Sequence, residues 1–312
     1  MSARTLDGQA LARTMHEEIR ADVAAFTRQH GRPPGLGIVL VGDNAASEVY
    51  VRNKLKTGSD IGFRADLERL PATATLAETL AVVERLNRSD VHDGILVQSP
   101  LPKAMGADAE QRVFDSILPA KDVDGLTPVN VGLLVQKRAI LVACTPSGVI
   151  ELLDRENIPI AGRHAVVIGR SDIVGKPMAL LLLHRDATVT VCHSRTPNLA
   201  AVCRGADILV AAVGKAGLVT KEFVKPGAAV VDVGMNKVVD ATIAGELFQE
   251  GHPRLALFRS KGSVLVGDVH PGVAEIAGAL TPVPGGVGPL TIAMLMRNTL
   301  RAASARSGQP VA

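Results

Sequence analysis

Residues 165–183 constrain the fold of this chain more than any other stretch, because they are typical of a buried strand, a tight turn and a helix. Residues 165–168 form a short apolar run rich in β-branched side chains, as a central parallel strand requires. Gly169 permits a turn that other residues resist, and the apolar run 178–183 predicts a helix packed on the sheet. The N-terminus of that helix presents unpaired N–H groups, and Gly175 lets a ligand approach the backbone, so an anion is favoured there.

The glycine spacing in this stretch departs from the dinucleotide fingerprint G-x-G-x-x-G, which fails here at its second glycine. An ordinary strand–turn–helix connection is therefore an open alternative. The end of the next predicted strand, residues 187–192, favours a cofactor, because Ser194, Arg195 and Thr196 follow it and no Asp or Glu does. A free ribose hydroxyl usually pairs with a carboxylate at this place, whereas a 2′-phosphate pairs with Arg or hydroxyl groups. If a dinucleotide binds, the pattern predicts NADP rather than NAD.

The composition of the chain favours a two-domain α/β protein. Its 312 residues suit two domains, 47% of them are hydrophobic, and aromatic residues make up only 2%, so the cores are aliphatic. A net charge of +3 is spread along the chain without a basic run, which argues against nucleic acid as a partner. The three cysteines form no CxxC pair, and no apolar stretch reaches the length of a membrane span. We therefore expect a cytoplasmic protein that binds no membrane.

Further periodic segments alternate along the chain as expected for repeated strand–helix units. Three such units in succession after residue 165 predict right-handed crossovers and a parallel sheet. We expect the helix that follows the first strand to have Ser47 as its N-cap, a domain boundary near residue 142, and a frayed tail after residue 303. The predicted helices are 6–29, 47–61, 75–86, 144–153 and 291–301, and the predicted strands are 36–41, 95–97, 205–214, 227–236 and 264–268.

Several side chains are candidates for chemistry. Tyr50 and Lys54 are four residues apart and share one helical face, although a solvated pair is the alternative. Gln98 stands at the carboxyl end of a predicted strand, where ligands gather in open α/β sheets, or it caps a loop. Asp122 and Asp124 could bind a polar ligand, form turns with their own backbone, or bind a metal, for which no further ligands lie at suitable spacing.

The loop 281–290 contains three prolines and three glycines, which favours a stiff binding surface. With this loop included, the chain resembles the bifunctional methylenetetrahydrofolate dehydrogenase/methenyltetrahydrofolate cyclohydrolase family. The matching motifs are Tyr50-x-x-x-Lys54, Val97-Gln98, Lys121-Asp-Val-Asp-Gly125, Gly169-Arg-Ser-x-x-Val-Gly175 and Pro282-Val-Pro-Gly-Gly-Val-Gly288.

The resemblance implies two α/β domains with a cleft between them, and a homodimer. Residues 1–142 would form the catalytic, folate-binding domain, residues 143–285 a Rossmann-like NADP domain with a parallel sheet, and residues 286–312 a helix that returns to the first domain. The implied chemistry is reversible oxidation of methylenetetrahydrofolate to methenyltetrahydrofolate with NADP, followed by hydrolysis to formyltetrahydrofolate. No metal is implied.

The resemblance also implies roles for individual residues. Lys54 is the expected catalytic lysine, Gln98 its hydrogen-bond partner, Tyr50 a residue that stacks near the folate, and Asp124 the residue that holds the pterin ring. The expected cofactor contacts are Gly169, Arg170, Ser171 and Met235, with Ser194 and Arg195 near the 2′-phosphate. The expected substrate contacts are Tyr50, Val97, Gln98, Ser99, Asp124, Pro282, Val283, Pro284, Gly285, Gly286 and Leu290.

Two positions depart from the family pattern: Ser99 stands where Leu is usual, and His270 where an acidic residue is common. Hydride transfer mainly needs alignment of the reacting atoms, whereas hydrolysis needs an activated water. Lys54 could assist hydrolysis as a neutral base or as a charge that stabilises a developing oxyanion. Two other functions stay open, an NADP-dependent dehydrogenase without cyclohydrolase activity and an NADP sensor with a degenerate folate site.

Overall fold

The computed structural model describes residues 2–308, which divide into two compact units. One unit holds the described residues up to Ala12 together with Thr145–Thr291, and the other holds Arg13–Cys144 with the described residues from Ile292 onward. The terminal helix α11 (Val287–Arg306) contributes to both. The division at residues 142 and 285 that the sequence suggests stays a prediction.

The first unit contains a six-stranded sheet in which every neighbouring pair is parallel. This confirms the expected α/β class with a parallel sheet. In spatial order the strands are β1 (Arg4–Thr5), β11 (Ala279–Leu280), β8 (Ala229–Asp232), β7 (Ile208–Ala211), β5 (His164–Ile168) and β6 (Thr188–Cys192).

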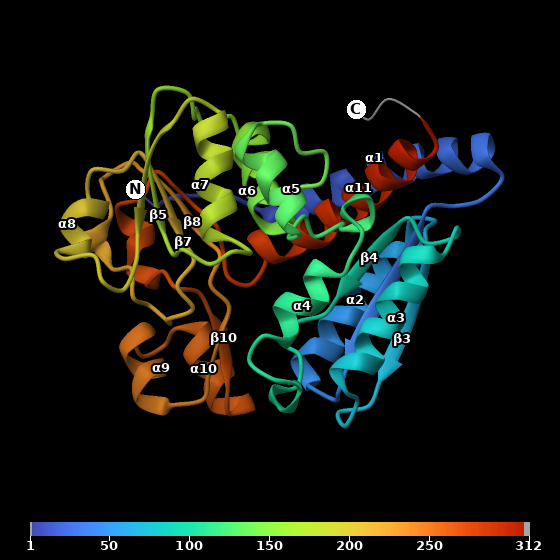
Figure 1. Cartoon of the computed structure of the whole chain (residues 1–312). Helices are drawn as coiled ribbons and strands as arrows, with labels where there is room; N and C mark the ends of the chain where they lie inside the picture. The colour runs from blue at the N-terminus through green and yellow to red at the C-terminus, as the bar shows by residue number, and fades with distance from the viewer. Residues whose placement is uncertain (1, 309–312) are drawn as a thin grey trace. The chain divides into compact units, whose positions relative to one another are not determined.

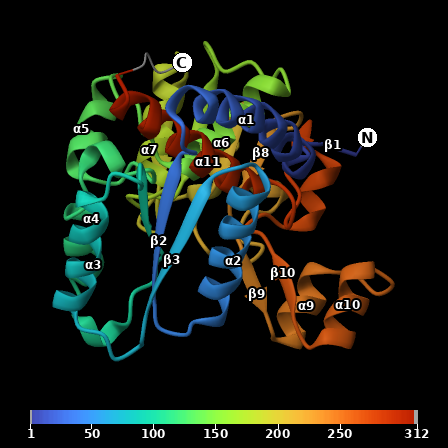
Figure 2. The same cartoon turned by 90° about the vertical axis from the view of Figure 1, so that its right-hand side faces the viewer.

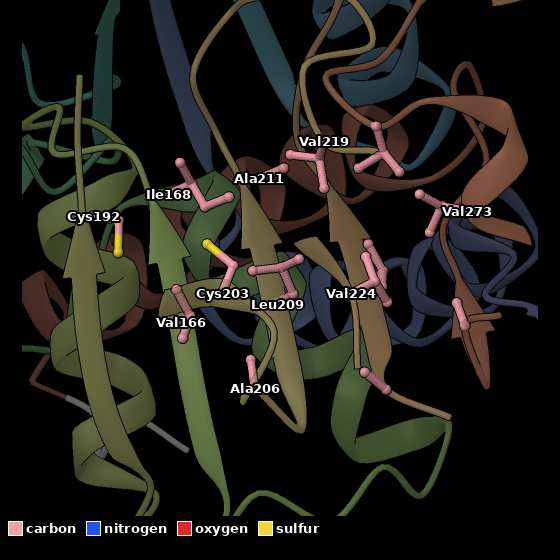
Figure 3. Close-up of a cluster of buried hydrophobic side chains, with 14 residues drawn as sticks. Val166, Ile168, Cys192, Cys203, Ala206, Leu209, Ala211, Val219, Val224 and Val273 are labelled. Atoms are coloured by element: carbon pink, nitrogen blue, oxygen red, sulfur yellow. The ribbon is translucent and has the colours of Figure 1, made fainter. Parts of the chain in front are cut away.

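Apolar side chains cover both faces of this sheet, as expected for buried parallel strands. Val166 and Ile168 of β5 point into one cluster, which Figure 3 shows together with Cys203 of α8 (Leu199–Cys203). Ala165 and Val167 join the opposite cluster, which includes residues of α6 (Cys144–Arg155) and α7 (Gly175–His184), the two helices drawn against the strands in Figure 1. Helices on both faces make this a doubly wound sheet.

A small substructure extends this unit at the carboxyl side of β8. The expected strand over 227–236 is two strands, because β8 ends at Asp232 and β9 (Asn236–Val238) begins four residues later. The expected strand at 264–268 is β10 (Val264–Val266), which pairs antiparallel with β9 and lies outside the parallel sheet. These strands pack with α9 (Ala241–Leu247) and α10 (Pro253–Lys261) around their own apolar cluster (Figure 1).

The second unit is built on a three-stranded parallel sheet in the order β3 (Arg64–Leu70), β2 (Gly35–Val41) and β4 (Gly94–Val97). Figure 2 shows α2 (Ala45–Asp60) on one side of these strands and α3 (Leu76–Arg88) with α4 (Ala109–Asp115) on the other. The remaining helices are α1 (Gly8–His30) and α5 (Pro128–Val135), and the short 3-10 turns are η1 (Lys103–Met105), η2 (Pro119–Lys121), η3 (Lys221–Phe223) and η4 (Pro271–Glu275).

The helix ends show where local signals suffice. Thr75 and Glu78 form a reciprocal capping box at the start of α3. The expected N-cap Ser47 is wrong, because the side chain of Asn44 accepts the N–H groups of Ala46 and Ser47 and so starts α2 three residues earlier.

The C-terminal helix is longer than expected at both ends. It begins at Val287 and runs to Arg306, so the expected fraying is wrong for residues 304–306. Residues 309–312 of the expected tail lie outside the described residues. Within residues 2–308, no helix combines the length and apolarity needed to cross a bilayer.

Candidate active site

The second unit brings Lys54 and Gln98 together. Helix α2 carries Lys54 one turn after Tyr50, and β4 ends one residue before Gln98. The Nζ atom of Lys54 donates a hydrogen bond to Oε1 of Gln98 over 3.0 Å. The Nε2 atom of Gln98 donates to the carbonyl of Ser99 over 2.7 Å, so the amide can present only its oxygen to the lysine. The pair therefore has a fixed orientation.

The two carboxylates of the 121–125 motif have different surroundings. Asp122 is buried and accepts hydrogen bonds from the backbone N–H of Thr127 at 2.7 Å and from Nδ2 of Asn130 at 2.9 Å, so it organises its own loop. Asp124 is half-buried, and burial raises the pKa of its carboxyl while the positive charge of Lys54 opposes that rise. Asp124 is therefore a carboxylate that interacts electrostatically with Lys54.

Lys121 in the same motif holds the loop in place. Its side chain is buried, and Nζ donates to the carbonyls of Leu86 at 2.9 Å and Ser89 at 2.6 Å, at the end of α3. Burial is the largest cause that lowers the pKa of this ammonium group to about 8. The lysine adds a charged donor to carbonyls at the helix C-terminus, which is a structural role.

Two residues that the sequence interpretation left without a role lie beside Asp124. The thiol of Cys144 lies 3.3 Å from the carbonyl oxygen of Val123 and also contacts the carboxylate of Asp124, so its single proton is shared between two acceptors. Its hydrogen bond to Asp124 lowers the pKa of that carboxylate. Burial raises the pKa of the Cys144 thiol, so the group stays a neutral donor. Asn298 of α11 contacts the same carbonyl through its amide. The available signal was a lone amide within an apolar helical run.

The remaining expected folate contacts of this unit differ in exposure. Tyr50 is 38% exposed, and partial burial raises the pKa of its hydroxyl. The side chain of Val97 lies in the core beneath β4, so only its backbone is available to a ligand. Ser99 donates from Oγ to Oε1 of Glu110 over 2.9 Å, and this bond to α4 replaces the apolar packing that Leu would give.

In the first unit, the loop between β5 and α7 needs glycine at two positions. Gly169 has φ +130°, and a Cβ atom there would lie 2.3 Å from the carbonyl oxygen of Ala212. A Cβ atom on Gly175 would lie 2.3 Å from the carbonyl oxygen of Gly169. Ser171 accepts the N–H group of Gly175 through Oγ, and Arg170 is exposed. The glycines therefore serve close packing of the turn as well as open backbone for a ligand.

The expected 2′-phosphate residues follow the neighbouring strand. Ile168 at the end of β5 pairs with Cys192 at the end of β6, so the loops after both strands leave the same edge of the sheet. Ser194 and Arg195 are exposed in the second of these loops, and no carboxylate stands between residues 193 and 196. Met235, in the turn between β8 and β9, is 42% exposed.

A buried carboxylate network lies at the carboxyl ends of strands in the same sheet and was not predicted. Asp232 accepts the N–H groups of Asp268 at 2.8 Å and Val269 at 2.9 Å, and burial raises the pKa of Asp232 to about 7. Asp268 accepts three successive backbone N–H groups, those of Val213, Gly214 and Lys215. The two side chains fix the loops that follow β7 and β8.

His270 belongs to this framework rather than to an acid–base site. Its Nδ1 accepts the N–H group of Gly272 over 3.0 Å, at the start of η4, and its Nε2 lies 3.3 Å from the carbonyl of Glu246. The departure from an acidic residue therefore alters a loop cap.

Residues 282–286 lie in the loop that connects β11 to α11, and residues 287–290 form the first turn of α11. Leu290 is fully buried and packs on Gly148 of α6, where a Cβ atom would lie 2.9 Å from the Leu290 side chain. The carbonyl of Val283 accepts from Arg254 over 2.6 Å, and Gly286 is buried. Pro282, Pro284 and Gly285 keep part of their surface exposed. The ligand contacts expected here stay predictions, and residues 2–308 contain no cluster of three His, Cys, Asp or Glu side chains suited to a metal.

The comparison with known proteins identifies the family of this chain. Residues 6–124 match the catalytic domain of the tetrahydrofolate dehydrogenase/cyclohydrolase family, and residues 143–307 match its NAD(P)-binding domain. The bifunctional protein FolD of Solibacter usitatus is 54% identical over 306 residues, which cover 98% of this chain and 99% of that protein. The chain belongs to the tetrahydrofolate dehydrogenase/cyclohydrolase family.

Other relatives agree with this membership. The bifunctional protein FolD of Koribacter versatilis is 52% identical over the full length of both chains. The structure of the methylenetetrahydrofolate dehydrogenase-cyclohydrolase of Trypanosoma brucei, solved with NADP and an inhibitor, is 41% identical, with a TM-score of 0.87 over 99% of this chain and 100% of that chain. The Campylobacter jejuni FolD structure is 39% identical, with a TM-score of 0.85 over 98% of this chain and 100% of that chain.

As a member of this family, the chain is a bifunctional enzyme of one-carbon folate metabolism. It oxidises methylenetetrahydrofolate to methenyltetrahydrofolate with NADP as cofactor, and it hydrolyses the product to formyltetrahydrofolate. The side chains in its catalytic domain match this chemistry in kind: Lys54, Gln98 and Asp124 offer a cation, an amide and a carboxylate within one unit.

Proposed function

We propose that Lys54, held by Gln98, is the group that makes the hydrolytic step possible, and that Asp124 holds the pterin ring of the folate. The observation that carries the proposal is the 3.0 Å hydrogen bond between Lys54 Nζ and Gln98 Oε1. An ammonium group with one N–H fixed in direction keeps its other N–H groups directed at a defined place. A water or developing oxyanion at that place would gain from a donor already oriented before the reaction.

Asp124 suits a ligand-holding role because burial and its neighbours have opposite effects on the pKa of its carboxylate. Burial raises its pKa, whereas Lys54 and the Cys144 thiol lower it. A pterin ring presents several N–H groups on one edge, and a carboxylate accepts such donors in pairs. Burial makes the charged carboxylate unfavourable and Lys54 favours it. Hydrogen bonds from the N–H groups of a pterin would stabilise the charged form further.

We propose further that the enzyme prefers NADP to NAD through Arg195 and Ser194. Both residues are exposed at the end of β6, beside the glycine turn that follows β5. A 2′-phosphate carries negative charge that Arg neutralises, whereas a free 2′-hydroxyl usually pairs with a carboxylate, and none stands between residues 193 and 196. Gly169, Arg170, Ser171 and Met235 are the proposed further contacts of the cofactor.

Proposals about assembly and location rest on the family and on the cysteines. Members of the family are typically homodimers, and we propose the same for this chain. All three cysteines, Cys144, Cys192 and Cys203, are free and buried, which agrees with a reducing compartment such as the cytoplasm. Sedimentation equilibrium across a range of protein concentrations tests the dimer, and a monomer at every concentration would contradict it.

One time course separates this function from its alternatives. The enzyme is mixed with NADP and methylenetetrahydrofolate, and two absorbances are followed, that of the reduced cofactor and that of the methenyl product. The proposal expects reduced cofactor to appear and the methenyl absorbance to decay faster than it does without protein. Cofactor reduction without faster decay would indicate a dehydrogenase alone. NADP binding without either change would indicate a sensor.

A further inference from the structure

Helix α11 places one fully buried amide, that of Asn298, against the backbone next to Asp124. The side chain has no exposed surface. Its Nδ2 atom lies 2.8 Å from the carbonyl oxygen of Val123 and 2.8 Å from that of Val142. An amide nitrogen carries two N–H groups, so each of these carbonyls receives one, and the nitrogen bridges two loop segments that are nineteen residues apart in sequence.

The orientation of this amide is fixed by what it contacts. If the amide were turned over, its oxygen would face two carbonyl oxygens, which repel it. In the orientation observed, Oδ1 of Asn298 accepts no hydrogen bond from the residues that the structure describes. A buried acceptor without a donor is unfavourable, so the two bonds made by Nδ2 are the reason that this residue type fits the position.

The carbonyl of Val123, which directly precedes Asp124 in the chain, is held by two side chains. It accepts from Asn298 and from the Cys144 thiol, at 2.8 Å and 3.3 Å. The Val123 side chain is buried against Gly94, where a Cβ atom would lie 2.5 Å from a Val123 methyl carbon. The carbonyl of Val123 and the N–H of Asp124 belong to one planar peptide unit. Holding the carbonyl therefore restricts the direction in which the Asp124 side chain points.

The residue on the other side of Asp124 is also fixed by the segment that Asn298 holds. Gly125 has φ +67°, and a Cβ atom there would lie 2.6 Å from the carbonyl carbon of Val142. Asn298 bonds the oxygen of that same carbonyl. One amide thus sets the spacing between the two segments that hold Asp124 from both sides.

We propose that Asn298 is a positioning residue for folate, acting through Asp124. This inference rests on the proposed role of Asp124 in holding the pterin ring. Without the amide, the Val123 peptide unit can rotate, and the carboxylate moves relative to Lys54 and to the ligand. A displacement of about 1 Å at such a site can reduce the rate roughly a hundredfold. The effect falls on folate binding and on both reactions, and leaves NADP binding unchanged.

The test compares Asn298→Ala with Thr299→Val. Thr299 is the next residue on α11, is equally buried, and donates to the carbonyl of Leu295 within the helix. Asn298→Ala loses two hydrogen bonds and leaves a cavity, whereas Thr299→Val loses one bond and keeps its volume, so Asn298→Ala should have the lower melting temperature and both variants are assayed well below it. We expect Asn298→Ala alone to raise the KM for the folate substrate by at least tenfold, with the Kd for NADP within twofold of the native value. Equal KM values in the two variants would overturn the inference.

A double-mutant cycle with Asp124→Asn tests the route of the effect. If Asn298 acts through Asp124, Asn298→Ala should change the folate KM less than twofold in the Asp124→Asn background. The same factor in both backgrounds would overturn the inference while leaving the role of Asp124 intact. An Asp124→Asn variant with native folate KM and rates would instead overturn the proposed function. If Asn298→Ala does not fold, Asn298→Ser, which keeps one donor, takes its place in the cycle.

Discussion

The ammonium nitrogen of Lys54 lies 3.0 Å from the amide oxygen of Gln98, and the nitrogen of that amide is bonded to the Ser99 carbonyl at 2.7 Å. The half-buried side chain of Lys54 is thereby held at the carboxyl end of β4. The two reactions need this lysine to different extents, because hydrolysis requires proton transfer around a water and hydride transfer mainly requires alignment of the reacting atoms.

Lys54→Met should reduce cyclohydrolase activity about a hundredfold to ten-thousandfold, the usual contribution of a proton-transferring group. The methionine keeps a long apolar stem, so the dehydrogenase should retain a measurable fraction of its rate if folate still binds. Lys56→Met is the matched control, because Lys56 lies on the same helix and pairs with the exposed Asp60. Both activities are measured by stopped assays. Cyclohydrolase activity within a few-fold of native would remove Lys54 from the mechanism.

Arg195→Ala should raise the KM for NADP more than the KM for NAD. Loss of one hydrogen bond between charged groups typically costs about 1.5–3 kcal/mol, which corresponds to roughly a ten- to hundredfold change in affinity for the 2′-phosphate. Arg163→Ala, an exposed arginine just before β5 at the opposite edge of the sheet, serves as control. Steady-state kinetics with both cofactors give the comparison. A similar increase for both cofactors would contradict the assignment.

Asp124→Asn should weaken folate binding and reduce both activities, whereas a strong chelator should leave the native enzyme unchanged. The asparagine keeps the size of the side chain but replaces one acceptor oxygen by a donor, which opposes the N–H groups of the pterin. Folate affinity is measured by titration calorimetry, and activity is measured before and after chelation. Activity that falls with chelator and returns with a divalent ion would show that Asp124 serves a metal instead.

The stability of the NADP-binding domain should depend on pH through Asp232, whose pKa is raised to about 7 by burial. An unfolded aspartate titrates near pH 3.9. As pH rises from about 4 to about 7, the unfolded state therefore loses this proton first, and the free energy of unfolding falls. The slope reaches at most about 1.4 kcal/mol per pH unit. Above about pH 7 the contribution is lost.

Urea unfolding at several pH values, in native protein and in Asp232→Asn, measures this slope. The native protein should lose stability relative to the variant between pH 4 and pH 7. Asp43→Asn, a change at an exposed aspartate, should keep the native slope. Parallel pH curves for native protein and Asp232→Asn would show that Asp232 does not titrate in this range.

The central strands were predictable because their environment is uniform. Residues 165–168, 208–211 and 229–231 are apolar on both faces, and a strand buried on both faces needs such a run. The antiparallel pair of β9 and β10 was not predictable in the same way. Each is only three residues long, and their pairing depends on a cluster around Phe248 and Phe258 that no local pattern reveals.

The candidate site divides in the same way. Tyr50 and Lys54 share a helical face by spacing alone, so their common direction follows from sequence. The difference between Asp122 and Asp124 does not, because it depends on Thr127 and Asn130 turning back to bond the first carboxylate. The roles of Asn298 and of the Asp232–Asp268 network could not be predicted either, because their hydrogen-bond partners are distant in sequence.

The two-residue strand β1 has a consequence for the order in which the protein forms. Arg4 pairs with Ala279 and Thr5 with Leu280, so the partners are 275 positions apart. A ribosome adds about 5–20 residues per second, which means that the first strand waits roughly 14–55 s for its neighbour to be made. Long-range pairing of this kind is also slow in refolding. The start of the chain therefore joins the sheet last, after most of the protein has left the ribosome.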